Sequence, residues 1–394
     1  MRQIRRHDAF WKRVVGAAVA LGILAASTGA AQADTIRSRQ WYLDAMRAEE
    51  MWKNSTGAGV TVAVVDTGVD ADLPDIQGQV LPGKDFSGVE GGAQSDYDGH
   101  GTDMALIIAG TGKSHGGAGT FGLAPGAKIL PVRFANAQAP ARGFRAMSSM
   151  AMAIRFAADS EAKIINISQA GPSQSEVNAK AVEYALSKGK LVFAGVGNSG
   201  KEGNQVLYPA AYPGVVGVAA VDEAIKATDE SERGPQVDLA APGDNIVTAC
   251  KGGTGLCRGH GTSAATALAS ASAAVVWSAH PDWTAHQVLR VLINTAGGPK
   301  SGEKRSDSLG YGVVRPRIAL QNPGDPGPPD VSPLPELAAA PAKSVASAPA
   351  RSQAGDAKSS DDGHLLLIAG VAAAVAVAAG AAAILVWRRR DLPG

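Results

Sequence analysis

Residues 61–68 read Thr-Val-Ala-Val-Val-Asp-Thr-Gly, a run of apolar, mostly β-branched residues that ends in an acid and a glycine. A continuous apolar run of this length is typical of a strand buried on both faces of a parallel sheet. Asp66 therefore falls at the carboxyl end of a strand, where ligands bind in open α/β sheets. A carboxylate there can accept a hydrogen bond from an imidazole. Because Asp before Gly is also common in turns, Asp66 alone does not define a site.

Runs of the same character alternate with helical patterns through the globular part of the chain, from about residue 34 to residue 320. The expected strands are 60–65, 128–132, 163–167, 191–194, 215–221 and 236–239. The expected helices are 102–108, 147–158, 176–187 and 262–278. This alternation predicts an α/β fold, with a mostly parallel sheet that carries helices on both faces.

A second string, Gly-His-Gly-Thr at 99–102, places a histidine between two glycines. We expect Thr102 to cap the helix that follows, so that His100 lies at its start and can act as a general base. Asp96 and Asp98 precede it, and a metal-binding loop is an alternative, although the remaining ligands of a calcium loop are missing. The same four residues recur at 259–262. We assign the base to His100, because a helix begins directly after it, and we expect His260 to be a loop residue near the site.

A third string, Gly-Thr-Ser-Ala-Ala at 261–265, places Ser263 at the start of a helix of small residues. The positive end of that helix favours developing negative charge, and the Ser263 backbone N–H can donate to an oxyanion. Asn198 lies in a glycine-rich loop after an apolar run, where its amide can supply a second donor. Taken alone, Ser263 could simply cap a helix and Asn198 could be a turn residue. The order Asp, His, Ser, however, is one of the chain orders known for the serine hydrolase triad.

Together these strings resemble the subtilisin-like serine proteases, and the resemblance spans about residues 41–320. It implies a subtilisin-like fold and an endopeptidase that hydrolyses protein or peptide substrates through an acyl-enzyme. No cofactor is required, and a structural calcium ion is left open because no metal-ligand set is evident in the sequence. The catalytic residues that the resemblance implies are Asp66, His100 and Ser263, with Asn198 at the oxyanion. The substrate-binding residues that we expect with them are Ser168, Gly171, Gly195 and Gly197.

The sequence departs from the family pattern beside the site. Leu106 stands where a small glycine is usual in the helix after His-Gly-Thr. The segment Ser168-Gln169-Ala170-Gly171 replaces the usual Ser-Leu-Gly. The resemblance therefore does not predict the substrate preference of this chain.

Both ends of the chain carry targeting patterns. Residues 1–33 combine a basic leader, an apolar run and a small-x-small site, which predicts a signal peptide, with an uncleaved anchor as the alternative. Residues 365–387, from Leu365 to Trp387, carry no charge and would form a helix about 34 Å long, enough to cross a hydrocarbon core of about 30 Å. Residues 388–394 are basic, which favours a cytoplasmic tail. We therefore expect a single-pass protein of the cell membrane whose protease domain lies on the extracytoplasmic side.

Between these ends we expect an N-terminal extension at 34–56, a protease domain at 57–321 and a Pro/Ala-rich linker at 322–364. The prolines interrupt any helix or strand, so the linker is predicted to be a spacer. This layout resembles the mycosins, the membrane-anchored subtilases of type VII secretion. The resemblance implies a membrane protein of a secretion complex as a possible partner. A largely non-catalytic scaffold that stabilises such a complex is the alternative function.

The net charge and the cysteine content of the chain bear on two further possibilities, a nucleic-acid partner and a zinc site. The formal net charge is +1 at pH 7, which argues against a nucleic-acid partner. Cys250 and Cys257 are the two cysteines of the chain. With His260 they could suggest zinc, but a fourth ligand is not evident and the cysteines of exported proteins normally oxidise. We expect a local disulfide that closes the loop before Ser263.

Overall fold

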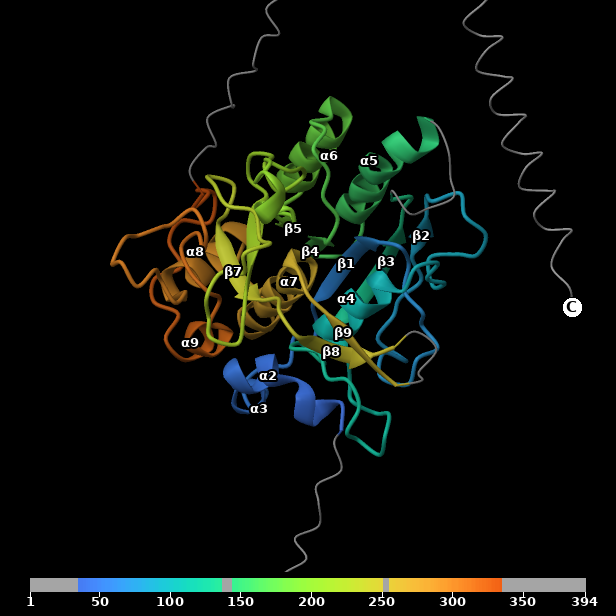
Figure 1. Cartoon of the computed structure of the whole chain (residues 1–394), viewed down its shortest axis with the longest axis horizontal. Coiled ribbons are helices and arrows are strands. Elements are labelled where there is room, and N and C mark those ends of the chain that lie inside the picture. The colour runs from blue at the N-terminus through green and yellow to red at the C-terminus, as the bar shows by residue number, and fades with distance from the viewer. Residues whose placement is uncertain (1–34, 137–143, 251–254, 335–394) are drawn as a thin grey trace, which may run out of the picture. The chain divides into compact units, whose positions relative to one another are not determined.

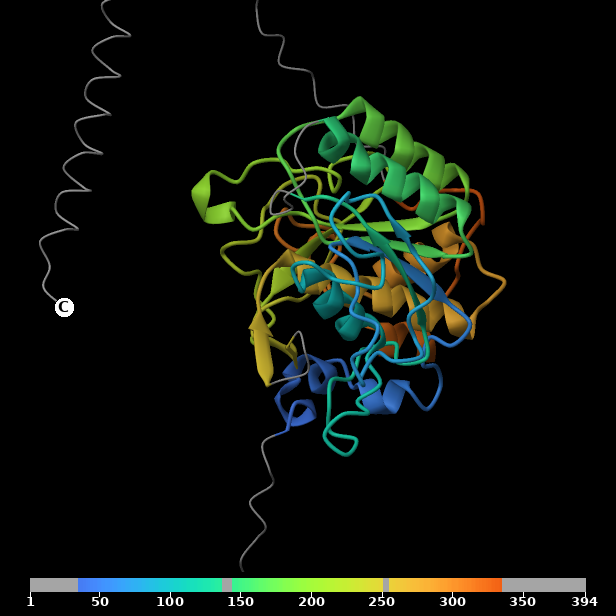
Figure 2. The same cartoon turned by 90° about the vertical axis from the view of Figure 1, so that its right-hand side faces the viewer.

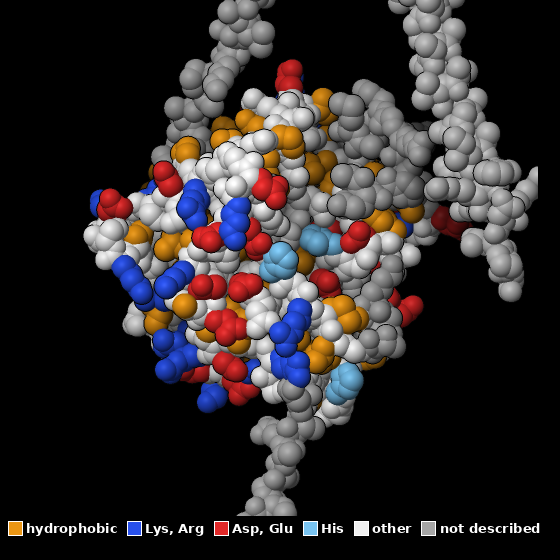
Figure 3. Space-filling view, in the orientation of Figure 1, with side chains coloured by type: hydrophobic (Ala, Val, Ile, Leu, Met, Phe, Trp, Pro, Cys, Tyr) orange, Lys and Arg blue, Asp and Glu red, His pale blue; other side chains and the backbone are white. Residues whose placement is uncertain are grey.

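The computed structural model describes residues 35–136, 144–250 and 255–334 (Figure 1). The expected signal peptide, membrane span and basic tail lie outside these residues. Within the described ranges, no helix combines the length and the apolar character that a membrane crossing requires. On the face shown in Figure 3, acidic and basic side chains are interspersed, so this face presents no broad basic surface.

A seven-stranded sheet forms the centre of the domain, and every neighbouring pair of strands is parallel. In spatial order the strands are β2 (Lys84–Asp85), β3 (Lys128–Arg133), β1 (Thr61–Asp66), β4 (Ile164–Ile167), β5 (Leu191–Gly195), β6 (Val216–Val221) and β7 (Leu239–Pro242). The α/β fold expected from the sequence is therefore confirmed. Because β1 lies between β3 and β4, the strand order reverses there, and a ligand site is expected beyond its carboxyl end.

Two hydrophobic cores lie on opposite faces of this sheet. Successive side chains of a strand point to opposite faces, so Val62 and Val64 of β1 enter one core while Ala63 and Val65 enter the other. The helices α5 (Phe144–Asp159) and α6 (Glu176–Ser187) cover one face, and α4 (His100–Ala109) and α7 (Thr262–Ala279) cover the other (Figures 1 and 2). Leu106 of α4, where the family usually has glycine, is fully buried in the first core.

Helix α7 is buried on all sides, and this fixes the position of Ser263 in its first turn. Every residue from Ala264 to Trp277 is buried. Small side chains allow the helix to pack against β4, β5, β6 and β7 and also against α4. Its buried hydroxyls are satisfied: the Ser270 hydroxyl donates to Asn166 Oδ1 at 3.0 Å, and the Thr266 hydroxyl donates to the Thr262 carbonyl at 2.7 Å.

One expected strand is displaced. The strand expected at 236–239 is found at Leu239–Pro242. Just before it, the Val237 carbonyl accepts from Arg305, and the Gly217 N–H of β6 donates to the Asp238 side chain. Several elements were not expected from the sequence: η1 (Arg37–Arg39), α2 (Trp41–Ala45), α3 (Ala48–Met51), the edge strand β2, η2 (Gly200–Glu202), the antiparallel pair β8 (Ile246–Ala249) and β9 (Leu256–Gly259), α8 (Ala285–Thr295) and α9 (Pro316–Gln321).

The segments that flank the domain are bound to it. Tyr42 of the N-terminal extension is fully buried, and the Gln40 side chain pairs with both backbone groups of Phe121. At the other end, Arg290 of α8 donates to the carbonyl oxygens of Pro326 and Val331, each at 2.6 Å. Residues 322–334, which we expected to begin a free spacer, therefore lie against α8.

Candidate active site

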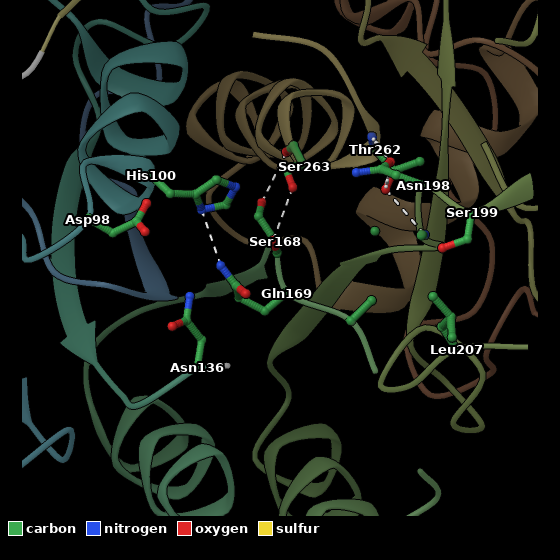
Figure 4. Close-up of a pocket in the computed structure, with 13 residues that line it drawn as sticks. Asp98, His100, Asn136, Ser168, Gln169, Asn198, Ser199, Leu207, Thr262 and Ser263 are labelled. Atoms are coloured by element: carbon green, nitrogen blue, oxygen red, sulfur yellow. Dashed lines mark hydrogen bonds between the residues drawn. The ribbon is translucent and has the colours of Figure 1, made fainter. Parts of the chain in front are cut away.

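A cavity of about 280 Å³ lies beyond the carboxyl ends of β1, β4 and β5 (Figure 4). It is lined by Asp98, His100, Asn136, Ser168, Gln169, Ala170, Gly195, Gly197, Asn198, Ser199, Leu207, Thr262 and Ser263. None of the described residues of the extension, 35–56, lines it. The fold thus brings a histidine, a serine and an asparagine from three distant strings to one opening.

Asp66 and His100 form a tight pair at this cavity. Asp66 is fully buried at the end of β1, and its Oδ1 lies 2.8 Å from His100 Nδ1. The Thr67 backbone N–H donates to the same oxygen at 2.8 Å. Burial lowers the pKa of His100, but Asp66, followed by Asp103 and Asp98, raises it more strongly, to about 9. The carboxylate therefore holds the imidazole in place and favours its charged form.

Asp96 supports the loop that carries His100, a role that was missed in the sequence. Its carboxylate accepts five hydrogen bonds, from the hydroxyls of Thr67 and Thr102 and from the backbone N–H groups of Asp98, Gly99 and Thr102. Helix α4 begins at His100, after Gly99 at φ 109°, so the expected cap by Thr102 is wrong. The Thr102 hydroxyl donates to Asp96 instead, at 2.6 Å. The spacing of Asp96 before Gly-His-Gly-Thr was the available signal.

The metal-loop alternative is not supported in the described part of the chain. No group of three or more His, Cys, Asp or Glu residues there is arranged to hold a metal ion. The carboxylate oxygens of Asp96 already accept hydrogen bonds from five protein donors, so they have little capacity left to bind a cation.

Ser263 faces the same cavity from the first turn of α7. Its hydroxyl donates to the Ser168 carbonyl at 3.1 Å rather than to His100, and the Ser168 hydroxyl donates to the Ser263 carbonyl at 3.0 Å. Figure 4 shows Ser263 and the His100 ring on the same side of the segment that carries Ser168. A turn of the serine side chain is therefore needed before its hydroxyl can bond to the imidazole.

The Asn198 amide is held in one orientation by the residue before Ser263. Asn198 Oδ1 accepts from the Thr262 backbone N–H at 2.8 Å and from the Thr262 hydroxyl at 3.0 Å. The Nδ2 group makes no hydrogen bond to any described residue, and Figure 4 shows it on the side of the cavity that faces Ser263. This arrangement leaves the amide N–H groups free to donate to a ligand.

Three of the four expected substrate-binding residues line the cavity, namely Ser168, Gly195 and Gly197. Gly171 does not. Its backbone N–H and carbonyl both pair with Tyr208, each at 2.9 Å, so neither group is free to bind a peptide backbone. Ala170, one residue earlier, lines the cavity instead.

The cysteines and the second histidine lie outside the cavity lining. Cys250 and Cys257 form the expected disulfide beside the β8–β9 pair, which excludes them as zinc ligands. His260 is mostly exposed, and its Nδ1 lies 2.9 Å from Glu230 Oε2. It is a loop residue, as the sequence predicted, and it faces a different carboxylate from that of His100.

The chain matches the subtilase family of peptidases, the S8 peptidases, over residues 57–312, and it belongs to that family. The resemblance to the subtilisin-like proteases that the sequence suggested is thereby confirmed. Fervidolysin of Fervidobacterium pennivorans is 32% identical over 324 residues, which are 75% of this chain and 46% of fervidolysin. For the next two curated relatives, the matched region covers 61% of their length.

Solved structures of two mycosins are also similar. MycP1 from Mycobacterium smegmatis matches with a TM-score of 0.66 and 29% identity, over 76% of this chain and 89% of that one. The MycP3 protease from the type VII (ESX-3) secretion system matches with a TM-score of 0.61 and 32% identity, over 71% of this chain and 87% of that one.

Proposed function

We propose that this chain cleaves peptide bonds with Ser263 as nucleophile, His100 as general base and Asp66 as the group that orients His100. The observation that carries the proposal is the 2.8 Å contact between Asp66 and His100 at the cavity where Ser263 begins a buried helix. Asn198, anchored through its oxygen by Thr262, is the proposed oxyanion donor, together with the Ser263 backbone N–H.

The geometry supports the following order of steps. The Ser263 hydroxyl leaves the Ser168 carbonyl, turns toward His100 Nε2 and gives up its proton as its oxygen attacks the peptide carbonyl. The carbonyl oxygen becomes negative between Asn198 Nδ2 and the N-terminal end of α7, where donors and the helix dipole favour charge. His100 then gives the proton to the leaving amine, and water hydrolyses the acyl-enzyme by the same route in reverse.

We also propose that the chain is exported and anchored in the cell membrane through residues 365–387, as a mycosin of type VII secretion. The order of a signal sequence, a protease domain, a proline-rich segment and an apolar run supports this role. The similarity to MycP1 and MycP3 supports it further. Its substrates are then expected to be proteins exported by the same cell.

A fluorophosphonate probe tests the chemistry. We expect it to label the wild-type chain at Ser263 and to leave Ser263→Ala unlabelled. Labelling of Ser263→Ala at the wild-type rate would place the nucleophile elsewhere. Incubation of the active chain with exported proteins of the same cell, followed by mass spectrometry of the new termini, identifies the substrates. Fractionation of the cell and protease shaving test the membrane anchor and the side on which the domain lies.

A further inference from the structure

Gln169 follows β4 at a position where the subtilase pattern has leucine, and its side chain turns toward His100 (Figure 4). Its Nε2 lies 3.2 Å from Asp66 Oδ1 and 3.3 Å from His100 Nδ1. The residue before it, Ser168, accepts from the Ser263 hydroxyl. Two consecutive residues therefore contact all three side chains of the proposed triad.

The donor and acceptor roles in this contact follow from the chemistry of the groups. His100 Nδ1 must carry a hydrogen to bond to Asp66 Oδ1 at 2.8 Å, so it has no lone pair with which to accept from Gln169. The Gln169 amide therefore donates to the carboxylate. Asp66 is fully buried, and its other oxygen, Oδ2, has no partner in the described part of the chain. All of the donors to this carboxylate converge on Oδ1.

We propose that Gln169 is a positioning residue that tunes this pair, an inference that rests on the proposed function. By donating to Asp66, the amide offsets part of the carboxylate charge, and its positive N–H end opposes a proton on the adjacent ring. Gln169 therefore weakens the hold of Asp66 on the imidazolium. A larger share of His100 is then neutral, and able to accept the serine proton, at a given pH.

The surroundings of His100 explain why such a donor matters. The titratable and charged groups around His100 are Asp66 on β1, Asp96, Tyr97 and Asp98 in the loop before α4, Asp103 on α4 and Arg133 on β3. The carboxylates of Asp66, Asp103 and Asp98 raise the pKa of His100 to about 9 against the effect of burial. Among the described residues that line the cavity there is no lysine or arginine to oppose them. The Gln169 amide is therefore a group that partly offsets the effect of these carboxylates on His100.

The test follows the rate of fluorophosphonate labelling of Ser263 against pH, in the full chain and in three variants of Gln169. Gln169→Met keeps the length and removes the donor, so the midpoint of the rate profile should move to higher pH by a few tenths of a unit. Gln169→Glu adds a negative charge and should move it upward by about one unit, whereas Gln169→Lys should move it downward. A role in substrate contact alone would change the rate without moving the midpoint in this order.

Matched substitutions of Gln94, which is exposed and lies outside the cavity lining, control for a general effect of charge. Gln94→Glu and Gln94→Lys should leave the midpoint near that of the wild type. Circular dichroism identifies the folded variants, and the Glu and Lys variants of Gln169 decide the question if the Met variant does not fold. Midpoints that coincide across the Gln169 variants overturn this inference alone. Absence of labelling in the wild type overturns the proposed function itself.

Discussion

The chain contains Gly-His-Gly-Thr twice, at 99–102 and at 259–262, and the two copies adopt different structures. In the first copy the helix begins at the histidine, and His100 contacts the buried carboxylate of Asp66. In the second copy Gly259 ends strand β9, His260 and Gly261 lie between strand and helix, and α7 begins only at Thr262. His260 is left mostly exposed, against Glu230.

The threonines of the two copies also differ in their partners. Thr102 binds Asp96 and so holds the loop of the base, whereas Thr262 binds Asn198 and so holds the proposed oxyanion donor. The motif Gly-His-Gly-Thr by itself therefore does not define a catalytic histidine. His100 differs from His260 because the buried strand β1 ends beside it, and the carboxylate of Asp66 at that end lies 2.8 Å from His100 Nδ1.

The largest expected contrast is between the two histidines. His100→Ala should lower kcat by about 10⁶, the loss that removal of the corresponding group causes in subtilisin. His260→Ala removes only the exposed contact with Glu230 and should change kcat/KM by less than about fivefold, since such pairs contribute at most about 1 kcal/mol. Steady-state cleavage of one peptide by both purified variants makes the comparison. Comparable losses in the two variants would contradict the assignment of the base.

The pH dependence of cleavage should follow His100 and not His260. The base must be neutral to accept the serine proton, and the pKa of His100 is raised to about 9, so kcat/KM should climb about tenfold per pH unit below that value. For the same reason, proton binding at His100 stabilises the folded chain below about pH 6.5, and this contribution is lost as pH rises through about 9.

His260→Ala is the control for this pH profile and should leave its midpoint unchanged. Asp66→Asn removes the charge that raises the pKa of His100 and should move the midpoint of the residual activity downward. A midpoint near pH 6.5 in the wild type, unaffected by Asp66→Asn, would show that the carboxylate does not govern the base.

The main elements that carry the site could be predicted from the sequence, and the contacts that were not predicted were missed for identifiable reasons. The strand before Asp66 and the helix after Ser263 have strong patterns because both are buried, and the structure places them as expected. The support from Asp96 was missed although its partner Thr102 lies only six residues away. The contact of Gln169 with Asp66 could not be foreseen, because the two residues are 103 positions apart in the chain. The pairing of Gly171 with Tyr208 is likewise a tertiary contact that no local pattern records.

The two supporting carboxylates should differ in their effect on stability. Asp96→Asn places an amide where two donors of Thr102 now meet an oxygen, so buried donors lose their acceptor and the free energy of unfolding should fall by about 1–3 kcal/mol or more. Glu230→Gln weakens only the pair with exposed His260 and should cost at most about 1 kcal/mol. Urea unfolding in a Ser263→Ala background, which prevents self-cleavage, measures both. Equal costs would mean that the Asp96 network adds little to the stability of the loop.

The smallest expected contrast concerns the first glycine of each copy. Gly99 has φ 109°, a conformation that favours glycine, so Gly99→Ala should cost about 1–2 kcal/mol and disturb the start of α4 at His100. Gly259 has no positive φ, and a Cβ there would meet no atom within 4 Å. Gly259→Ala should therefore be neutral or stabilise by up to about 1 kcal/mol, through the lower entropy of the unfolded chain. In the same Ser263→Ala background, the urea midpoint of Gly99→Ala should fall, whereas that of Gly259→Ala should stay the same or rise. If both fall by the same amount, the backbone of the second copy is as constrained as that of the first, and the difference between them lies in the carboxylates alone.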